Sequence, residues 1–184
     1  MTGASVHHGA LDGFADATVP VLQLNGGATL RPLLPEDVTP AYVAALNDPK
    51  VNHFLIGPRR TFQTDQTVKG FVAVNFHAED ALLFGLFTEG RHHGTVRLHD
   101  ICPDSAFVGL AIFNTEMWGK GWGTAMICAV RDYALLDLQL NCVRAVIDAA
   151  NAGSQKAFEK AGFRVNIDSA TPPNNQLWEI RRNG

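Results

Sequence analysis

The stretch GLAIFNTEMWGKGWGTAM, residues 109–126, decides how this chain folds. It ends an apolar, strand-like run and then places Gly119, Gly121 and Gly123 at every second position before residues typical of a helix. Bare backbone N–H groups at a helix N-terminus favour an anion such as pyrophosphate, because the helix dipole adds positive charge there. A flexible connection between a strand and a helix explains the glycines equally well when the stretch is taken alone.

Two familiar phosphate-binding patterns do not fit this stretch. The P-loop pattern GxxxxGK[ST] occurs nowhere in the sequence. The dinucleotide pattern GxGxxG, begun at Gly119 and Gly121, requires a third glycine where Thr124 stands. The glycines therefore need another explanation.

Composition and charge narrow the class of protein. A chain of 184 residues that is 46% hydrophobic and 18% charged suits one globular domain, which we expect over residues 20–184 after a flexible N-terminal arm at 1–19. The net charge of −3, without a long run of Lys or Arg, argues against a nucleic-acid or membrane partner. Three cysteines without a CxxC pair and no apolar run of membrane length indicate a soluble cytoplasmic protein.

The periodicity of the apolar residues predicts a mixed order of elements. A strand over 28–34 precedes a helix within 35–48, for which Thr39 is the expected N-cap and Pro40 the first helical residue. Val68, Phe71, Val72 and Phe76 predict a second helix. Short strands follow at 81–87, 94–101 and 106–113, then a helix to about 136, a strand at 142–148, a helix at 151–162 and two closing strands. The three consecutive strands predict an antiparallel meander, and the last portion adds a parallel pair.

The stretch at 109–126, followed after one helix and one strand by DAANAGSQKAFEKAGFR (148–164), resembles the acetyl-CoA site of the GNAT superfamily of N-acyltransferases, in particular its RimJ/RimL-like branch. The resemblance covers residues 28–181. It implies an α+β fold with a mixed, mostly antiparallel sheet of about seven strands, flanked by about four helices. In that fold the fourth strand (106–113) and the fifth (142–148) splay apart, and the pantetheine of CoA enters between them.

The resemblance also implies which residues bind acetyl-CoA as a cosubstrate, with no metal. Trp118 stands at the first position of the family's Gln/Arg-x-x-Gly-x-Gly/Ala signature, which is a departure from the wider superfamily, and Gly121 and Gly123 stand at its glycines. The residues expected to contact CoA are Ala111, Ile112, Phe113, Trp118, Gly119, Lys120, Gly121, Trp122, Gly123, Thr124, Asn151, Ser154 and Phe158.

The implied activity is direct transfer of an acetyl group to a primary amine in a ternary complex. The acceptor is either a protein N-terminus or a small-molecule amine, and the mildly acidic composition favours the small molecule. Homodimers are frequent in the family, so a homodimer is one expectation. A protein of another class, a CoA-binding sensor or partner-binding module with the same fold and no efficient transfer, is the alternative.

The sequence leaves the acid–base residues open. The usual glutamate of the fourth strand is Phe107, so Glu116 and the His99-Asp100 pair are the candidate bases, unless they are merely solvated turn residues. The family's tyrosine proton donor is replaced by Phe158, which leaves Ser154 as the expected donor to the CoA thiolate. The alternative is that Ser154 only caps the following helix.

The acceptor side is expected at the loop VNHFLIGPRRTFQ, residues 51–63, and the second helix. Phe54, Arg59 and Arg60 are the predicted contacts, since arginine forks bind acidic groups, although solvated loop arginines are the simpler explanation. His92 and His93 lack further ligands at metal-binding spacing and are interpreted as turn residues.

Overall fold

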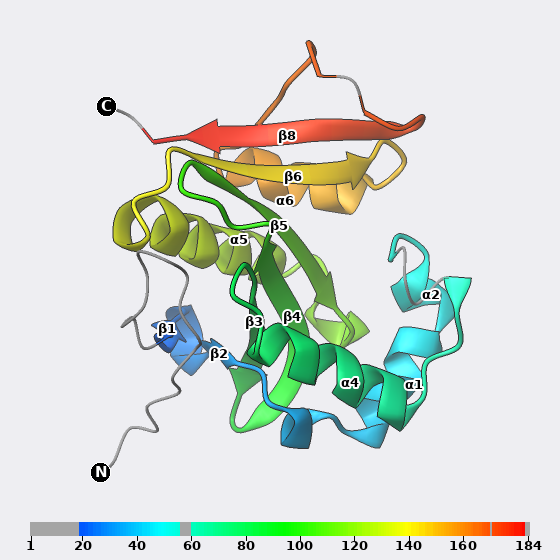
Figure 1. Cartoon of the computed structure of the whole chain (residues 1–184). Coiled ribbons are helices and arrows are strands. Elements are labelled where there is room, and N and C mark those ends of the chain that lie inside the picture. Colours follow the sequence, from blue (N-terminus) through cyan, green and yellow to red (C-terminus); the bar gives the residue numbers. More distant parts are fainter. Residues whose placement is uncertain (1–18, 56–59, 170, 183–184) are drawn as a thin grey trace.

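The computed structural model describes residues 19–55, 60–169 and 171–182 (Figure 1). One sheet of eight strands runs in the order β1-β2-β3-β4-β5-β6-β8-β7. All neighbouring strands are antiparallel except β5 and β6, which are parallel. The strands are β1 (Leu22–Gln23), β2 (Thr29–Pro32), β3 (Leu82–Thr88), β4 (Arg91–His99), β5 (Ser105–Ile112), β6 (Cys142–Asp148), β7 (Arg164–Val165) and β8 (Asn175–Arg181).

The α-helices are α1 (Pro40–Asn47), α2 (Pro49–Asn52), α4 (Asp65–Phe76), α5 (Trp122–Asp132) and α6 (Ala152–Lys160). The predicted α+β fold with its meander and parallel pair is confirmed. The sheet has eight strands rather than about seven, because two of its strands, β1 and β7, are only two residues long and leave no periodicity to detect. The predicted arm at 1–19 lies outside the described residues up to position 18.

Side chains cap the helices on the N-terminal half of the chain, and the cap predicted at Thr39 is confirmed. The Thr39 side chain accepts a hydrogen bond from the Tyr42 N–H, and Pro40 begins α1. Thr64 accepts from the Thr67 N–H at the start of α4. These bonds satisfy N–H groups that have no partner within the helix.

The hairpin between β3 and β4 is tighter than the sequence suggests. Its two linking residues, Glu89 and Gly90, have φ angles of 49° and 74°, which is the left-handed pair of a type I′ turn. Consequently His92 and His93 belong to β4, and their interpretation as turn residues was wrong.

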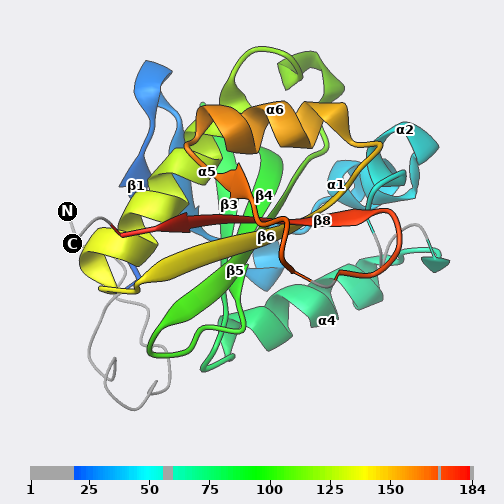
Figure 2. The same cartoon turned by 90° about the horizontal axis from the view of Figure 1, so that it is seen from above.

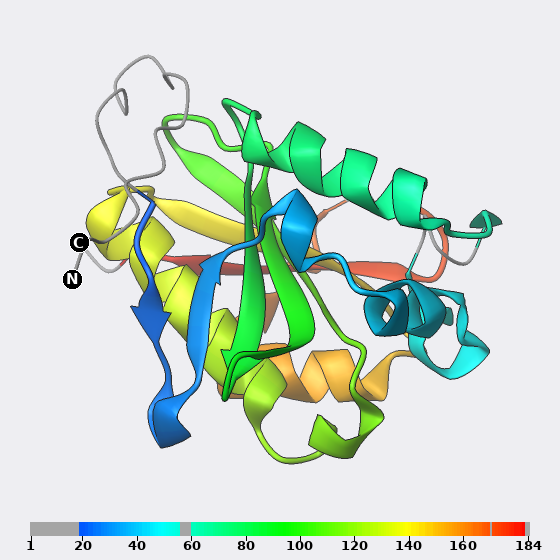
Figure 3. The same ribbon diagram turned by 90° about the horizontal axis from the view of Figure 1, so that it is seen from below.

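The sheet separates two apolar clusters, as the alternation along β3 makes clear. Leu82, Phe84 and Leu86 belong to the cluster that includes α5 and α6, whereas Leu83 and Phe87 belong to the cluster with α1 and α4. Figure 2 places α6 and α4 on opposite sides of β6 and β8, and Figure 3 places α4 and α5 on opposite sides of β3 and β4. Each face of the sheet is therefore covered by its own helices.

The parallel pair β5 and β6 is joined over only part of its length. Ser105 to Phe107 pair with Cys142 to Arg144. Beyond this point β5 continues to pair with β4 up to Ile112, and β6 continues to pair with β8 up to Asp148. The two strands thus separate toward the end that faces α2, as Figure 1 shows. The predicted splay is confirmed.

Candidate active site

A cavity of about 550 Å³ occupies the opening between β5 and β6. Its volume falls in the range of sites that hold small molecules. One wall comes from α6, where it includes Asn151, Ser154 and Phe158. The opposite wall comes from α1, α4, the preceding loop and β4, and it includes Phe54, Phe71, Tyr42, Arg97 and His99. The cavity therefore connects the two faces of the sheet through the split.

The backbone of β5 presents peptide groups to this opening. The Phe113 N–H donates to the His93 carbonyl at 3.1 Å. Bonded positions alternate along an antiparallel ladder, so Ala111 also directs its peptide groups toward β4. Leu110 and Ile112 consequently direct theirs toward the open side.

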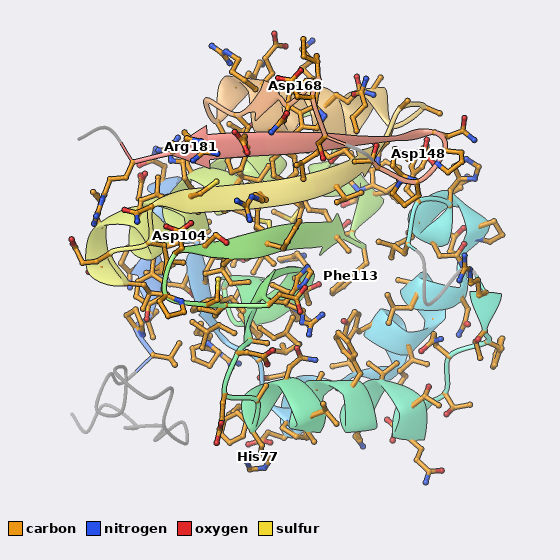
Figure 4. All side chains as sticks on the ribbon, turned by 45° about the horizontal axis from the view of Figure 1, so that its top comes forward. His77, Asp104, Phe113, Asp148, Asp168 and Arg181 are labelled. Atoms are coloured by element: carbon orange, nitrogen blue, oxygen red, sulfur yellow. The ribbon has the colours of Figure 1, made fainter. Side chains whose placement is uncertain are left out.

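The closed end of the pair gives the same alternation. There the Cys142 N–H donates to the Asp104 carbonyl at 3.1 Å, which sets even-numbered positions of β5 toward β6. Figure 4 labels Asp104 at this closed end, with Asp148 and Phe113 toward the open end. The Phe113 ring packs 4.7 Å from that of Tyr42 in the α1 and α4 cluster. The structure thus directs the backbone groups expected at Ala111 and Phe113 away from the opening.

The glycines of the turn before α5 serve different purposes. Gly119 and Gly121 have φ angles of 73° and 88°, a left-handed conformation that other residues adopt only with strain. An added Cβ at either would meet no atom within 4 Å in the part of the chain that the structure describes, so the backbone conformation and not crowding requires glycine there. Gly123 has an ordinary φ, and a Cβ there would lie 3.6 Å from Leu110 Cδ1 in normal contact.

No side chain of the described residues caps the N-terminus of α5. Gly121 is its N-cap, and the first helical bond runs from the Ala125 N–H to the Gly121 carbonyl at 3.0 Å. The N–H groups of the first turn precede that bond and have no acceptor within the helix. Each of the other four α-helices described above has a capping side chain. The first turn of α5, which includes the expected residues Trp122 and Thr124, and the exposed Lys120 before it together suit an anion.

Trp118 fastens the turn to the end of β5. Its indole N–H donates to the Ile112 carbonyl at 2.7 Å, while the side chain stays 45% exposed. This bond uses the Ile112 carbonyl and leaves the Ile112 N–H facing the opening. The Asn114 side chain adds a second tie, since it is bonded to His93 Nδ1 at 3.0 Å.

The α6 wall contradicts the interpretation of Ser154 as the capping side chain. Asn151 is the N-cap of α6, and its Oδ1 accepts from the Ser154 N–H at 3.0 Å. The capping acceptor is therefore the asparagine side chain, and Ser154 lines the cavity. Phe158 lines it too, buried edge-on against Phe163.

Of the two candidate bases, only one lies at the cavity. His99 lines it, with its Nδ1 2.9 Å from Asp100 Oδ2 and its ring stacked 5.8 Å from that of Phe107. Glu116 is exposed in the 3-10 helix Thr115–Met117 and is not part of the cavity wall. The structure brings Ser154 and His99 to one cavity and leaves Glu116 outside it.

On the acceptor side, Phe54 lines the cavity as expected. Arg60 is exposed and outside the wall, and Arg59 lies outside the described residues. Arg97 also lines the cavity, although it was not among the predicted contacts, and its Nε donates to Asn75 Oδ1 at 2.5 Å. The signal in the sequence that could have identified Arg97 is its charge, which stands within a run predicted to be a strand.

Tyr42 is the second missed residue. It is 3% exposed, and burial raises the pKa of its phenol to about 12, although a hydrogen bond with Thr95 opposes the shift. Its hydroxyl is therefore protonated at every physiological pH. The signal in the sequence was an aromatic residue with a hydroxyl group near the start of a predicted helix, on the face that α1 buries together with Leu46.

The structure combines a split parallel pair, a glycine turn that leads into an uncapped helix, and a cavity through the split. A comparison with protein families agrees with this combination. The family model described as an acetyltransferase (GNAT) domain matches residues 28–164. The chain belongs to this family. The resemblance on which the sequence analysis relied is thereby confirmed.

Individual relatives are more distant. A probable N-acetyltransferase, YjcK of Bacillus subtilis (strain 168), is 35% identical over 102 residues, which are 52% of this chain and 56% of YjcK. The match thus spans little more than half of that relative. RimL, a ribosomal L7/L12 alpha-N-protein acetyltransferase solved with coenzyme A, superimposes with a TM-score of 0.75 at 13% identity, covering 88% of this chain and 98% of RimL. The aminoglycoside acetyltransferase AAC(6')-Ib, solved with coenzyme A and kanamycin, gives 0.68 at 17% identity, covering 84% and 95%.

Within residues 19–55, 60–169 and 171–182, no three His, Cys, Asp or Glu side chains are grouped as metal ligands. In the same part of the chain, no helix combines the length and the apolar character needed to cross a bilayer.

Proposed function

We propose that this protein transfers the acetyl group of acetyl-CoA directly to a primary amine in a ternary complex. The observation that carries the proposal is the cavity through the β5–β6 split, which is lined from α6 on one side and from α1 and α4 on the other. Such a cavity admits two reactants from opposite faces of the sheet and lets them meet inside it. Membership of the GNAT acetyltransferase family supports the choice of reactants.

In this proposal the CoA lies along β5 and α5. Its pyrophosphate binds the uncapped first turn of α5, whose conformation depends on Gly119 and Gly121. Its pantetheine arm extends along the open edge of β5, where Leu110 and Ile112 offer peptide groups. The thioester then lies within the cavity beside Ser154, on the α6 wall.

The reaction needs two proton movements. The amine nitrogen attacks the thioester carbonyl carbon, the new C–N bond forms, and the C–S bond breaks to release CoA thiolate. An alkylamine has an unperturbed pKa of about 10.4, so a base must remove a proton, and we assign this to His99, held by Asp100. Ser154 passes a proton to the departing thiolate and regains one from solvent, to which His99 releases the proton taken from the amine. A β5 N–H at Leu110 or Ile112 stabilises the carbonyl oxygen as it becomes negative.

The acceptor is a small-molecule amine or a protein N-terminus. The names of RimL and of the aminoglycoside enzyme represent one of each kind. The modest cavity volume and the net charge of −3 support a small molecule here. The second candidate, a CoA-binding sensor without efficient transfer, is favoured by Phe107 and Phe158, which occupy the positions of two common acid–base residues.

The first test is thermal unfolding with acetyl-CoA, CoA and NAD at equal concentrations. A ligand at a hundred times its Kd stabilises the folded state by about 2.7 kcal/mol. We expect both CoA species to raise the Tm and NAD to leave it unchanged. A protein that CoA does not stabilise contradicts both candidate functions.

Release of free CoA thiol with a panel of primary amines then separates enzyme from sensor. We expect His99→Gln to lower kcat by about 10²–10⁴-fold, while the Tm shift with CoA is retained. Glu116→Gln is the matched control, because it removes a carboxylate outside the cavity and should keep the full rate. CoA binding without turnover of any amine supports the sensor instead.

A further inference from the structure

We propose that the acceptor amine carries a second, anionic group, a carboxylate or a phosphate, and that Arg97 binds it. The inference rests on the proposed function, because it concerns the molecule that receives the acetyl group. Arg97 lines the cavity but takes no part in the proposed acetyl transfer, so its charge bears on which amines bind there.

Arg97 faces open space within the cavity. It lies in β4 directly opposite Gly109 of β5 and lines the cavity wall. A Cβ added to Gly109 would meet no atom of the described residues within 4 Å. The strand position that could cover the guanidinium has no side chain, so a ligand can approach it there.

The side chain of Arg97 is held in place by α4. Its Nε donates to Asn75 Oδ1 at 2.5 Å, and Asn75 Nδ2 in turn donates to the Phe71 carbonyl at 2.8 Å. Asn75 is only 2% exposed, because it lies on the buried stripe of α4 with Val68 and Val72. A buried asparagine on an apolar stripe is costly unless it is hydrogen-bonded, and here its bonds orient one arginine.

The guanidinium has no protein counter-ion in the described part of the chain. Within residues 19–55, 60–169 and 171–182, no carboxylate oxygen lies within 4.0 Å of Arg97, whereas Arg31, Arg131, Arg144 and Arg181 each have one. The carboxylate of Asp148 also lines the cavity, but it stands at the end of β6, where its Oδ1 accepts from the Ala150 N–H. Since only the Nε of Arg97 is used, its terminal N–H groups remain for a ligand.

The position of Arg97 fits an acceptor that reaches across the cavity. Its guanidinium belongs to the α4 side, with its carbon 5.8 Å from the Phe71 ring centroid, whereas Ser154 belongs to the α6 side. An acceptor anchored by its anion on Arg97 would direct its amine toward the split in the sheet. This anchoring would select amines that also carry a negative group.

Matched pairs of amines test the inference. Each pair differs only in the anion: an amino acid and its amide, a dipeptide and its amide, an aminoalkyl phosphate and its amino alcohol. Binding is measured by calorimetry in the presence of free CoA, which allows no turnover, and kcat/KM is measured separately with acetyl-CoA. We expect wild-type protein to favour the anionic member of at least one pair by about tenfold to a hundredfold, mainly through Kd and KM. The first two pairs report a carboxylate ligand and the third a phosphate.

Variants assign the preference to Arg97. Arg97→Gln should reduce the preference to about one by weakening only the anionic member, while Arg97→Lys should keep part of it because the charge remains. Arg91→Gln is the matched control, since it removes an exposed arginine of the same strand that does not line the cavity. Each variant must retain the CoA-induced Tm shift, which shows that it folds.

Two results would overturn the inference. One is wild-type protein that binds no anionic amine or binds both members of every pair equally. The other is an Arg97→Gln variant that folds and weakens acids and amides alike, because Arg97 would then only shape the wall. Preferential binding of the acids by wild-type protein without acetyl transfer would instead uphold Arg97 as an anion site and contradict the proposed activity.

Discussion

Protonation of His92 should destabilise the wall that carries Tyr42. The His92 ring packs among Tyr42, Phe87 and Phe113, at centroid distances of 4.9, 5.0 and 4.8 Å. Its Nε2 lies 2.9 Å from the Gly94 carbonyl, which can only accept, so Nε2 carries the hydrogen. Nδ1 is buried and has no hydrogen-bond partner within the described residues, so a proton added there would gain no acceptor.

The magnitude follows from the pKa. Burial lowers the pKa of His92 from 6.5 to about 4, the Coulombic effects of Arg31 and His93 act in the same direction, and the Gly94 bond and Asp37 oppose them. Between pH 4 and pH 6.5 the unfolded chain therefore binds a proton that the folded chain excludes, and stability falls as the pH falls. The full effect is about 3 kcal/mol, of which about 2 kcal/mol is lost between pH 8 and pH 5.

Urea unfolding of wild-type protein and His92→Phe at pH 8.0 and pH 5.0 measures this difference. Phenylalanine keeps an aromatic ring among Tyr42, Phe87 and Phe113 and removes the titrating nitrogens. The loss of unfolding free energy on acidification should be about 2 kcal/mol smaller in the variant than in wild-type protein. His77→Gln replaces an exposed histidine and should lose as much unfolding free energy on acidification as wild-type protein. The reasoning is refuted if His92→Phe and wild-type protein lose the same free energy.

Three further substitutions test the site. Gly121→Ala should lower the free energy of unfolding by about 1–2 kcal/mol and weaken CoA binding, because φ is 88° there, whereas Gly123→Ala should bind CoA nearly as tightly as wild-type protein. Equal CoA affinities of the two variants in calorimetry contradict the role of the turn. Ser154→Ala should keep CoA affinity and lower kcat by about tenfold or more, and a full rate in the thiol assay removes it as the proton donor. Gly109→Val should raise the KM for the amine and leave CoA affinity and Tm nearly unchanged, since its side chain enters open cavity; an unchanged KM argues that the acceptor binds elsewhere.

The features that could be predicted from the sequence depend on local chemistry. Thr39 and Asn151 begin helices through bonds to residues three positions away, and the left-handed turn at Gly119 and Gly121 depends on its own backbone angles. Local rules apply to such elements regardless of the rest of the fold. The order of β5, α5, β6 and α6, and the opening between the strands, followed from these motifs together with the family resemblance.

The features that were missed depend on contacts between distant segments. Arg97 and Asn75 are 22 positions apart and meet only because β4 packs against α4. His92 was misread because a two-residue turn extends β4 further back than the longer polar run TEGRHH suggests. Which peptide groups of β5 face the opening depends on the pairing register with β4, and a shift of one residue would have reversed the outcome at Ile112.

The split between β5 and β6 links stability to ligand binding. Buried backbone groups are almost always hydrogen-bonded. In the described part of the chain, however, the edge of β5 away from β4 has no partner strand beyond Phe107, and the first turn of α5 has no capping side chain. In the proposed complex one molecule of CoA satisfies both, its pantetheine amides along β5 and its pyrophosphate at α5. Free CoA should therefore slow amide hydrogen exchange at Leu110 and Ile112 together with the first turn of α5, whereas pyrophosphate alone should protect only α5. Protection at β5 by pyrophosphate would mean that the two segments respond as one unit and that the pantetheine arm is not needed to explain the open edge.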